Sequence, residues 1–215
     1  MPNYKVLANR SISDETFVLR TERPQVEILA GQCFSIGTEK IAINREYSMY
    51  SAANDPYVDF LIRNVEGGRV SNELQSMKPG DTVEIGGPYG QFCLDENLVK
   101  QGQKYLFIAT GTGIAPFHSF ALTYPELNYE ILHGVRFADE TYDKEDYGSS
   151  RYKSAISRPS ADQSPQRVTD LLIKRRWDPL EIVYLCGNRG MITDCVEILR
   201  CFGIAGDSIF TETFF

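Results

Sequence analysis

The pattern of apolar and polar positions differs between the two halves of this 215-residue chain. In the first half, short apolar or aromatic runs are separated by turn residues, and one short helix is expected between Ser71 and Met77. The runs predict strands at residues 4–13, 16–22, 31–37, 45–52, 57–65 and 81–87. Many short strands at this spacing are typical of an antiparallel barrel or sandwich.

In the second half, buried runs alternate with helical segments. Strands are predicted at 104–110, 129–135, 152–156 and 181–187, and helices at 113–124 and 191–203. This alternation predicts a parallel sheet with helices on both faces. We therefore expect a two-domain chain, with an antiparallel β-barrel at 1–97 followed by an α/β parallel-sheet domain at 103–215. The polar stretch 95–104 between them is expected to carry little structure.

The charge and the cysteine content limit the partners and the cellular compartment that we expect for the protein. The net charge of -7 argues against nucleic acid or an anionic membrane as a partner, because both attract basic surfaces. The N-terminus lacks the apolar run of a signal peptide, and the most apolar window, residues 105–122, is broken by glycine and proline. The five cysteines form no C-x-x-C pair. A reduced, cytoplasmic protein with no metal site is therefore expected.

The stretch "IATGTGIAP" carries the first candidate chemistry. Gly111 and Gly113 fit the start of a G-x-G-x-x-G fingerprint, but Pro116 stands where the third glycine belongs. A strand leading through glycines into a helix can bring free N–H groups close to a phosphate. Pro116 is tolerated in a first helical turn, and the small Ala115 lets helix and strand pack closely. The alternative is an ordinary strand–turn–helix connection. The loop sequence alone does not distinguish this from a nucleotide-binding loop.

The segment "REYS" of the first half supports the nucleotide interpretation. Arg45 and Tyr47 share a strand face, and Ser48 follows them. Singly they suggest a solvated cation and a core aromatic, but together they offer a phosphate fork, a stacking plate and a hydrogen-bond donor. About twenty residues on, glycines ending at Gly68 lead into a helix that begins near Ser71, a second candidate anion site.

Four motifs in order, R-x-Y-S, G-x-V-S, G-T-G-x-x-P and C-G-N, run across both predicted domains. Over nearly its whole length the chain resembles the ferredoxin–NADP(H) reductase superfamily. The resemblance implies that the barrel at 1–97 binds a flavin and that the domain at 103–215 binds NADP(H). FAD is the expected flavin, and FMN is an alternative because the chain is shorter than many members of the family.

The resemblance also assigns roles in flavin binding. Arg45 would bind a flavin phosphate, Tyr47 would stack on the isoalloxazine, and Ser48 would donate a hydrogen bond near N5. Members often end in an aromatic residue that stacks on the flavin and moves aside for the nicotinamide. The expected flavin-contacting residues are Arg45, Glu46, Tyr47, Ser48, Leu61, Ile62, Arg63, Gly68, Val70, Ser71, Thr112, Phe214 and Phe215.

For the nicotinamide nucleotide, the resemblance places Cys186 beside the nicotinamide ring and Glu212 near the flavin. Together with Ser48 they are the expected catalytic residues. The expected nucleotide contacts are Thr110, Gly111, Gly113, Arg136, Ser157, Arg158, Arg167, Cys186, Gly187 and Asn188. The flavin carries the chemistry, so no base–nucleophile pair is required, and both histidines, His118 and His133, are expected to be structural. Cys195 and Cys201 are expected to be buried core thiols.

A local excess of cations favours NADPH over NADH. Residues 151–176 contain seven Lys or Arg and two Asp, in a chain that is acidic overall. Arg158 and Arg167, with Arg136 upstream, are the expected ligands of a 2′-phosphate, because arginine binds phosphate in a bidentate manner. Lys174 to Arg176 are expected to form a solvated helix C-terminus.

The resemblance predicts an oxidoreductase that transfers electrons between NADPH and ferredoxin or flavodoxin through hydride exchange with flavin N5. One alternative is the reductase component of an oxygenase or a dihydroorotate-dehydrogenase-type system. Another is a flavin-binding module without turnover. A monomer or weak dimer is expected.

Overall fold

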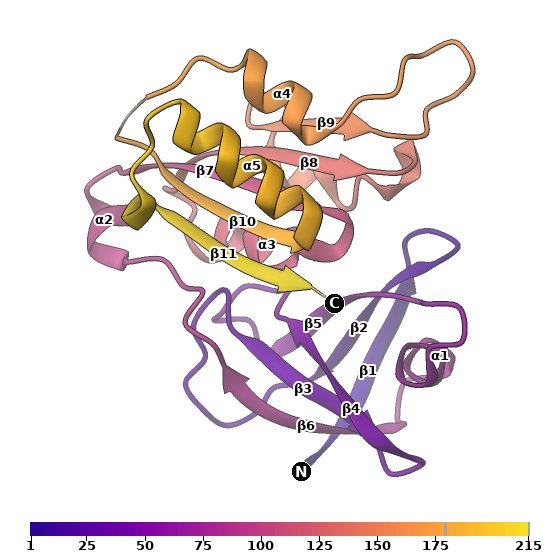
Figure 1. The fold of residues 1–215 in the computed structure, drawn as a ribbon. Helices are drawn as coiled ribbons and strands as arrows, with labels where there is room; N and C mark the ends of the chain where they lie inside the picture. Colours follow the sequence, from indigo (N-terminus) through magenta and orange to yellow (C-terminus); the bar gives the residue numbers. More distant parts are fainter. Residues whose placement is uncertain (179, 215) are drawn as a thin grey trace. The chain divides into compact units, whose positions relative to one another are not determined.

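The computed structural model describes residues 1–178 and 180–214. The chain divides into two compact units, Met1–Cys93 with Ala115–Thr123, and Leu94–Ile114 with Tyr124–Phe215. The elements in chain order (Figure 1) are β1 (Asn3–Ser11), β2 (Thr16–Glu22), β3 (Cys33–Thr38), β4 (Ile41–Ser48), β5 (Tyr57–Arg63), α1 (Arg69–Ser76), β6 (Thr82–Tyr89), α2 (Glu96–Lys100), β7 (Lys104–Thr110), η1 (Gly111–Ile114), α3 (Ala115–Thr123), β8 (Asn128–Val135), η2 (Ala138–Glu140), η3 (Lys144–Tyr147), β9 (Tyr152–Ile156), α4 (Val168–Lys174), β10 (Ile182–Asn188), α5 (Arg189–Cys201), η4 (Gly206–Ser208) and β11 (Ile209–Phe214).

The polar stretch near residue 95 is more ordered than its composition suggests. It contains α2, so the expectation of little structure was wrong. Asp95 caps this helix by accepting a hydrogen bond of 2.8 Å from the Asn97 N–H. An Asp at the N-cap satisfies a backbone donor that the first turn leaves unpaired, and this explains why so short a helix forms.

The N-terminal unit contains a six-stranded antiparallel sheet with the strand order β4-β3-β6-β1-β2-β5. The sheet curls, and its two edge strands approach each other at an isolated bridge between Met49 and Phe60. Beside this bridge, the Tyr50 N–H donates to the Asp59 carbonyl at 2.8 Å. The expected antiparallel β domain is therefore present, but its barrel is not closed, because an isolated bridge rather than a continuous ladder links the two edges.

An ion pair with a partly exposed arginine compensates the buried carboxylate of Asp59 on β5. Asp59 is buried, and the Arg20 guanidinium donates to both of its carboxylate oxygens at 2.8 Å. The two residues lie directly opposite each other on β5 and β2, and the guanidinium lies 3.5 Å over the Tyr57 ring. This bidentate geometry offsets the cost of removing the carboxylate from water.

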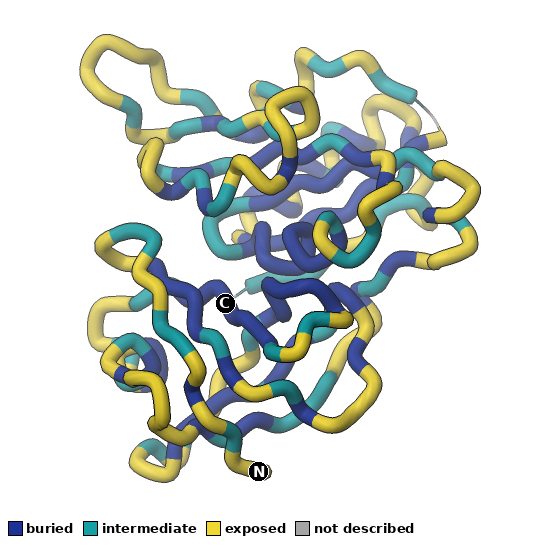
Figure 2. The backbone as a smooth tube through the Cα atoms, turned by 180° about the vertical axis from the view of Figure 1, so that it is seen from behind, coloured by how far each residue is buried: buried dark blue, intermediate teal, exposed yellow. Residues whose placement is uncertain are grey.

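The C-terminal unit contains a five-stranded sheet with the order β11-β10-β7-β8-β9, and all its strands run parallel. The helices α4 and α5 cover one face (Figure 1), and buried aliphatic side chains such as Leu106, Leu132 and Leu185 fill the space beneath them. The central strands are buried while the loop 157–165 is largely exposed (Figure 2). The edge strand β11, whose polar T-E-T pattern gave no strand signal, completes the sheet.

The cysteines of α5 differ in exposure. All five cysteines are free thiols, and Cys195 packs in the core as expected. The expectation for Cys201 was wrong, because it is exposed. Six positions separate the two residues, which is not a whole number of helical turns, so they face different sides of the helix. Among the described residues, no helix combines the length and apolar character needed to cross a membrane.

A network of ion pairs joins the N-terminal ends of the parallel strands. The Glu181 carboxylate is fully buried and is paired with both Arg175 and Lys104. Arg175 also contacts Glu130 at 3.0 Å, and Glu130 contacts Lys153 at 2.7 Å. Burial alone would raise the pKa of Glu130, but the hydrogen bonds and charges of Lys153 and Arg175 lower it. Arg175 is thus a buried partner, which corrects the expectation that all of 174–176 is solvated.

Removal of one charge from this network should destabilise the C-terminal unit. We expect Glu181→Gln to lower the free energy of unfolding by about 3 kcal/mol, because it leaves Arg175 buried without its full charge partner. The fluorescence of Trp177, the only tryptophan, reports on this unit, since Arg175 lies 5.2 Å from the Trp177 ring. Urea unfolding followed by this signal gives the measurement.

The matched control is Glu96→Gln in the exposed pair between Glu96 and Lys100, whose charged atoms lie 3.4 Å apart. We expect a loss of less than about 0.5 kcal/mol there. Similar losses in the two variants would show that the Glu181 network contributes no more than a surface ion pair.

Candidate functional site

The glycine loop lies at the C-terminal end of β7, where η1 leads into α3. Gly111 has a φ of +54°, and in the described part of the chain no atom outside its local backbone lies within 4 Å of the position that a Cβ would occupy. A Cβ on Gly113 would lie 2.4 Å from the carbonyl oxygen of Cys186 on β10. Gly111 therefore supplies the unusual backbone turn. Gly113 allows the loop to pack against β10, the strand adjacent to β7 in the sheet.

A second close approach fixes the "CGN" segment against the same strand end. Gly187 has a φ of +132°, and its Cβ would lie 2.4 Å from the Thr110 hydroxyl oxygen. That hydroxyl accepts a hydrogen bond of 2.9 Å from the Asn188 N–H. The Asn188 side-chain oxygen caps α5 by accepting from Gly190 N–H at 2.9 Å and Met191 N–H at 3.3 Å. The loops after β7 and β10 thus form one interlocked platform.

The two expected catalytic residues of the C-terminal unit lie together beside this platform. Cys186 on β10 and Glu212 on β11 are register partners, and the Cys186 thiol donates to Glu212 Oε2 with a Sγ–Oε2 distance of 3.8 Å. Burial raises the pKa of the Cys186 thiol, and the Glu212 carboxylate raises it further. The thiol therefore stays protonated and uncharged. Phe214 pairs with Asn188 and is half-buried, while Phe215 lies outside the described residues.

Three of the predicted phosphate-binding arginines gather at the C-terminal ends of β8 and β9. The Arg158 N–H donates to the Arg136 carbonyl at 2.8 Å, and the Gln166 N–H donates to the Ile156 carbonyl at 2.9 Å, which brings Arg167 to the same end. Arg158 and Arg167 are exposed. Next to them, the Ser157 hydroxyl donates to the Val135 carbonyl at 3.2 Å.

Arg136 differs from the other two arginines because an acid compensates its charge. Its Nε donates to the buried Glu140 carboxylate at 2.9 Å, four residues on. Burial would raise the pKa of Glu140, but its hydrogen bonds with Arg136 lower it. The cation excess of 151–176 is likewise reduced by pairing, since Lys153 and Arg175 contact acids at the opposite end of the strands. Within this segment, Arg158 and Arg167 are exposed cations that lie at the C-terminal ends of β8 and β9, where the expected phosphate site is.

On β4 of the N-terminal unit, the "REYS" residues lie as the strand period predicts. Arg45 pairs with Ile36 and Tyr47 with Phe34 across the ladder to β3, so both point to one face. Arg45 is exposed, and its Nη1 donates to the Asn44 carbonyl at 3.0 Å. Burial raises the pKa of Tyr47 to about 12, and the nearby Arg45 charge acts in the opposite direction. Glu46 is exposed and Ser48 is buried.

The start of α1 offers backbone donors beside the expected flavin residues. Gly68 is the N-cap and provides no side-chain hydrogen bond to the first turn. The hydroxyl of buried Ser71 holds the preceding turn by accepting from Val65 N–H at 3.3 Å and donating to Asn64 Oδ1 at 3.2 Å. Val70, which follows Gly68 by two positions, is buried in the first turn. The backbone N–H groups of this turn are therefore what the helix offers to an anion.

On β5, the expected flavin neighbours have side chains that are already engaged. Leu61 and Ile62 are buried in the core. Arg63 pairs with Glu15 at 3.1 Å. Of this segment, mainly the backbone remains for a ligand. Thr112, in contrast, is half-exposed on η1 of the other unit.

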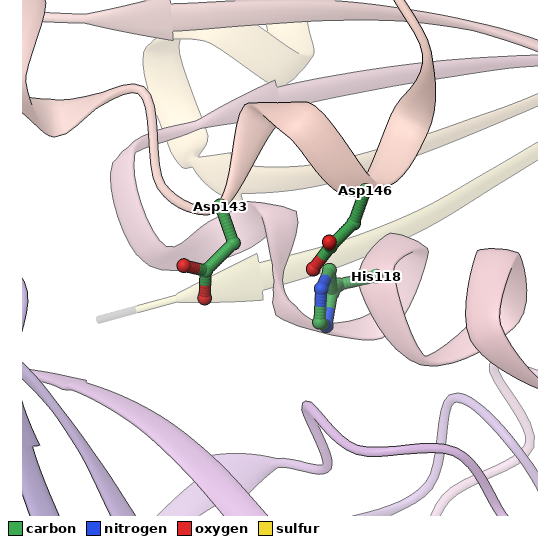
Figure 3. Close-up of side chains that lie close together, drawn as sticks. All are labelled: His118, Asp143 and Asp146. Carbon is green, nitrogen blue, oxygen red and sulfur yellow. The ribbon is translucent and has the colours of Figure 1, made fainter.

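His118 is buried in the N-terminal unit. It lies on α3, its ring stacks on Tyr50 at a centroid distance of 3.8 Å, and its Nδ1 lies 2.6 Å from the Tyr50 carbonyl oxygen. Figure 3 shows His118 on α3, and also Asp143 and Asp146 at η3, a segment of the C-terminal unit. There the Asp146 N–H donates to the Asp143 carbonyl at 3.0 Å. The contacts with Tyr50 give His118 a structural role.

His133 connects the glycine loop to the sheet, and sequence reasoning missed this contact. It is fully buried on β8, its Nε2 lies 2.9 Å from the Gly111 carbonyl oxygen, and its Nδ1 lies 2.7 Å from the Tyr152 hydroxyl. Burial lowers the pKa of His133 to about 4, although the Gly111 carbonyl and the Glu140 charge act in the opposite direction. A histidine at the end of a buried strand, one strand away from the loop, was the available signal.

The buried imidazole should make stability depend on acid pH. An unfolded chain binds a proton on His133 near pH 6.5, whereas the folded chain does so only near pH 4. Between these values protonation favours the unfolded state, so the free energy of unfolding falls as the pH drops below 6.5. At pH 5 this contribution amounts to about 2 kcal/mol. Urea unfolding at pH 7 and pH 5 measures the loss.

The comparison protein is His133→Gln, which lacks the titrating group but can keep a donor near the Gly111 carbonyl. We expect its loss of stability between pH 7 and pH 5 to be smaller than that of the wild type by about 2 kcal/mol. Equal losses would mean that another group is responsible for the acid sensitivity.

Both units match families of known proteins. Residues 3–93 match the family model of the oxidoreductase FAD-binding domain, and residues 107–197 match that of the oxidoreductase NAD-binding domain. The ferredoxin–NADP reductase B of Sorangium cellulosum (strain So ce56) is 30% identical over 179 residues, which cover 74% of this chain and 72% of that protein. The chain belongs to the ferredoxin–NADP reductase superfamily.

Other members of the superfamily are longer than the chain or share its fold at lower identity. The toluate 1,2-dioxygenase electron transfer component of Pseudomonas putida is 30% identical over 95% of this chain, which spans 65% of that protein. The chain spans 60% of the phenol hydroxylase P5 protein of Acinetobacter pittii (strain PHEA-2), with 28% identity over 91% of this chain. A ferredoxin NADP+ reductase from Neisseria gonorrhoeae, solved with bound FAD and NADP, shares the fold with a TM-score of 0.82 at 22% identity, covering 100% of this chain and 98% of that one.

The residues present fit the two groups that this superfamily binds. In the N-terminal unit, the exposed Arg45 guanidinium and the uncapped start of α1 form a donor set suited to a diphosphate. In the C-terminal unit, the open space over Gly111 leaves the loop backbone accessible to a second diphosphate. Both donor sets consist of groups that favour anions.

Proposed function

We propose that the chain is a flavin-dependent oxidoreductase that transfers electrons between NADPH and a one-electron carrier such as ferredoxin or flavodoxin. The observation that carries the proposal is the Cys186–Glu212 pair, which lies beside the interlocked glycine loops of an NAD-binding-type unit. The unit that precedes it in the chain matches an FAD-binding domain, which supplies the second half of such an enzyme.

In the N-terminal unit, the proposed flavin ligands bind different parts of the cofactor. The Arg45 guanidinium and the N–H groups at the start of α1 bind the diphosphate of FAD. Tyr47, which is half-buried and on the same face as Arg45, provides the stacking surface, and the Ser48 hydroxyl binds the polar edge of the ring. When bound, the flavin supplies hydride exchange with the nicotinamide and single-electron transfer to the carrier.

In the C-terminal unit, the proposed nucleotide ligands hold NADPH by its charged parts and by its ring. The loop around Gly111 binds the diphosphate, while Arg158 and Arg167 bind the 2′-phosphate. Thr112, which the sequence placed among the flavin contacts, is assigned in this proposal to the nucleotide diphosphate, because it follows Gly111 in the same loop. The protonated Cys186 thiol presents a small uncharged surface to the nicotinamide ring. Glu212 Oε2 accepts the hydrogen bond from Sγ, and this contact keeps the proton on the thiol and fixes its direction.

The preference for NADPH depends on Arg158. We expect Arg158→Ala to raise the KM for NADPH about 10- to 100-fold, because a charge-assisted hydrogen bond to phosphate contributes roughly 1.5–3 kcal/mol. The KM for NADH should change less than about threefold, since NADH has no 2′-phosphate. Steady-state kinetics with both nucleotides gives the comparison.

The matched control is Arg176→Ala, which removes an equally exposed charge beyond the end of α4. It should leave the preference unchanged. Equal effects of Arg158→Ala on NADPH and NADH would contradict the assignment of the 2′-phosphate site.

The decisive experiment is the visible spectrum of the purified protein, followed anaerobically as NADPH or NADH is added. The proposal expects a yellow protein that NADPH bleaches faster than NADH. A colourless protein that also fails to take up FAD or FMN would overturn the flavin assignment of the REYS segment. A yellow protein that neither nucleotide bleaches would instead support a flavin carrier without turnover.

A second candidate is the reductase component of an oxygenase system. Its support is the similarity to the dioxygenase electron transfer component, which extends over 95% of this chain. The electron acceptor separates the two functions. Rapid NADPH-dependent reduction of ferredoxin or flavodoxin supports the first proposal, whereas slow reduction of both, with fast reduction of an oxygenase-linked iron–sulfur protein, supports the second.

A further inference from the structure

The peptide bond between Gly111 and Thr112 is held from inside the sheet by His133. The imidazole Nε2 lies 2.9 Å from the Gly111 carbonyl oxygen, and the ring is fully buried. In a trans peptide the carbonyl and the following N–H point in opposite directions. Because the carbonyl of Gly111 points inward to His133, the N–H of Thr112 points outward from the loop.

The hydrogen-bond partners also settle the tautomer of this histidine. A carbonyl oxygen only accepts, so the proton must be on Nε2, and Nδ1 must then accept from the Tyr152 hydroxyl at 2.7 Å. Burial raises the pKa of Tyr152, which therefore remains a donor. The Tyr152 ring stacks on Tyr147 at 5.4 Å with an interplanar angle of 8°. The ring of His133 is thus oriented from both ends.

Gly111 has no side chain that could restrain this peptide. Gly111 has a positive φ, and among the described residues no atom outside its local backbone lies within 4 Å of the position of an added Cβ, so no side-chain contact fixes the residue there. Glycine visits many backbone conformations, and a peptide flanked by glycine can rotate unless a hydrogen bond fixes it. The bond from His133 supplies that restraint.

We propose that His133 is a positioning residue of the nucleotide site, which directs the Thr112 N–H outward as a preformed donor to the diphosphate of the nicotinamide nucleotide. This inference rests on the proposed function of the glycine loop. Preorganisation of a donor increases affinity because the bound ligand does not have to order the loop. His133 itself touches no ligand and acts only through Gly111.

Calorimetric titration of the flavin-loaded protein with NADP+ tests the inference without turnover. His133→Leu removes both hydrogen bonds, and we expect the Kd for NADP+ to rise about tenfold, the effect of one well-placed hydrogen bond. His133→Gln places an amide N–H near the position of Nε2, and its Kd should stay within about threefold of the wild type. His133→Asn, whose amide is too short to reach Gly111, should behave like His133→Leu. An unchanged Kd in His133→Leu would overturn the proposal.

Adenosine 2′-monophosphate serves as the second probe, because it carries the phosphate bound by the arginines but no diphosphate. Its affinity should be the same in the wild type and in all three His133 variants. Equal weakening of both probes would indicate general damage to the unit and would overturn the positioning role. A wild-type protein that binds neither probe would instead refute the proposed function.

Tyr152→Phe keeps the test decisive if His133→Leu does not fold. The change removes only the hydroxyl that orients the imidazole. We expect the Kd for NADP+ to rise about threefold, a part of the full effect, with no change for adenosine 2′-monophosphate. An unaltered NADP+ affinity in this variant would count against the orienting chain from Tyr152 through His133 to Gly111.

Discussion

The candidate nucleotide site depends on a steric constraint, the close approach of two backbone loops. Gly113 lies against the Cys186 carbonyl and Gly187 lies against Thr110, at distances that leave no room for a Cβ on either residue. With side chains there, the loops after β7 and β10 would have to separate. The Asn188 N–H bond to Thr110 depends on this approach. Loss of the approach would also disturb the position of Cys186 opposite Glu212.

Each unit offers donor groups for anions in a different way. In the N-terminal unit a strand places a cation beside an aromatic ring, and a short helix adds uncapped backbone donors. In the C-terminal unit the donors come from a loop whose shape is set from below by a buried imidazole. In this loop the donors are backbone N–H groups, so their direction rather than a side-chain charge favours an anion there.

The features that follow from local periodicity could be predicted from the sequence. The strand runs, the two domain rhythms and the strand–loop–helix around Gly113 follow from patterns a few residues long, and the fold confirms them. The burial of Arg175, the pairing of Arg136 with Glu140 and the contact of His133 with Gly111 could not be predicted from such patterns. Each depends on which charged or polar groups meet after folding, and Arg175 meets one partner 45 positions away. The exposure of Cys201 was within reach of a helical-period argument that compared it with Cys195.

The parallel sheet separates two kinds of residue along its strands. At the N-terminal ends, Glu181, Arg175 and Glu130 form a buried ionic network, while the exposed arginines and the glycine loops lie at the C-terminal ends. The residues of the ionic network and those of the candidate nucleotide site are therefore different residues. Over evolutionary time, substitutions at the C-terminal ends could therefore change which nucleotide is preferred without weakening the network that holds the strands together. Cofactor preference in such a domain can drift while foldability is conserved.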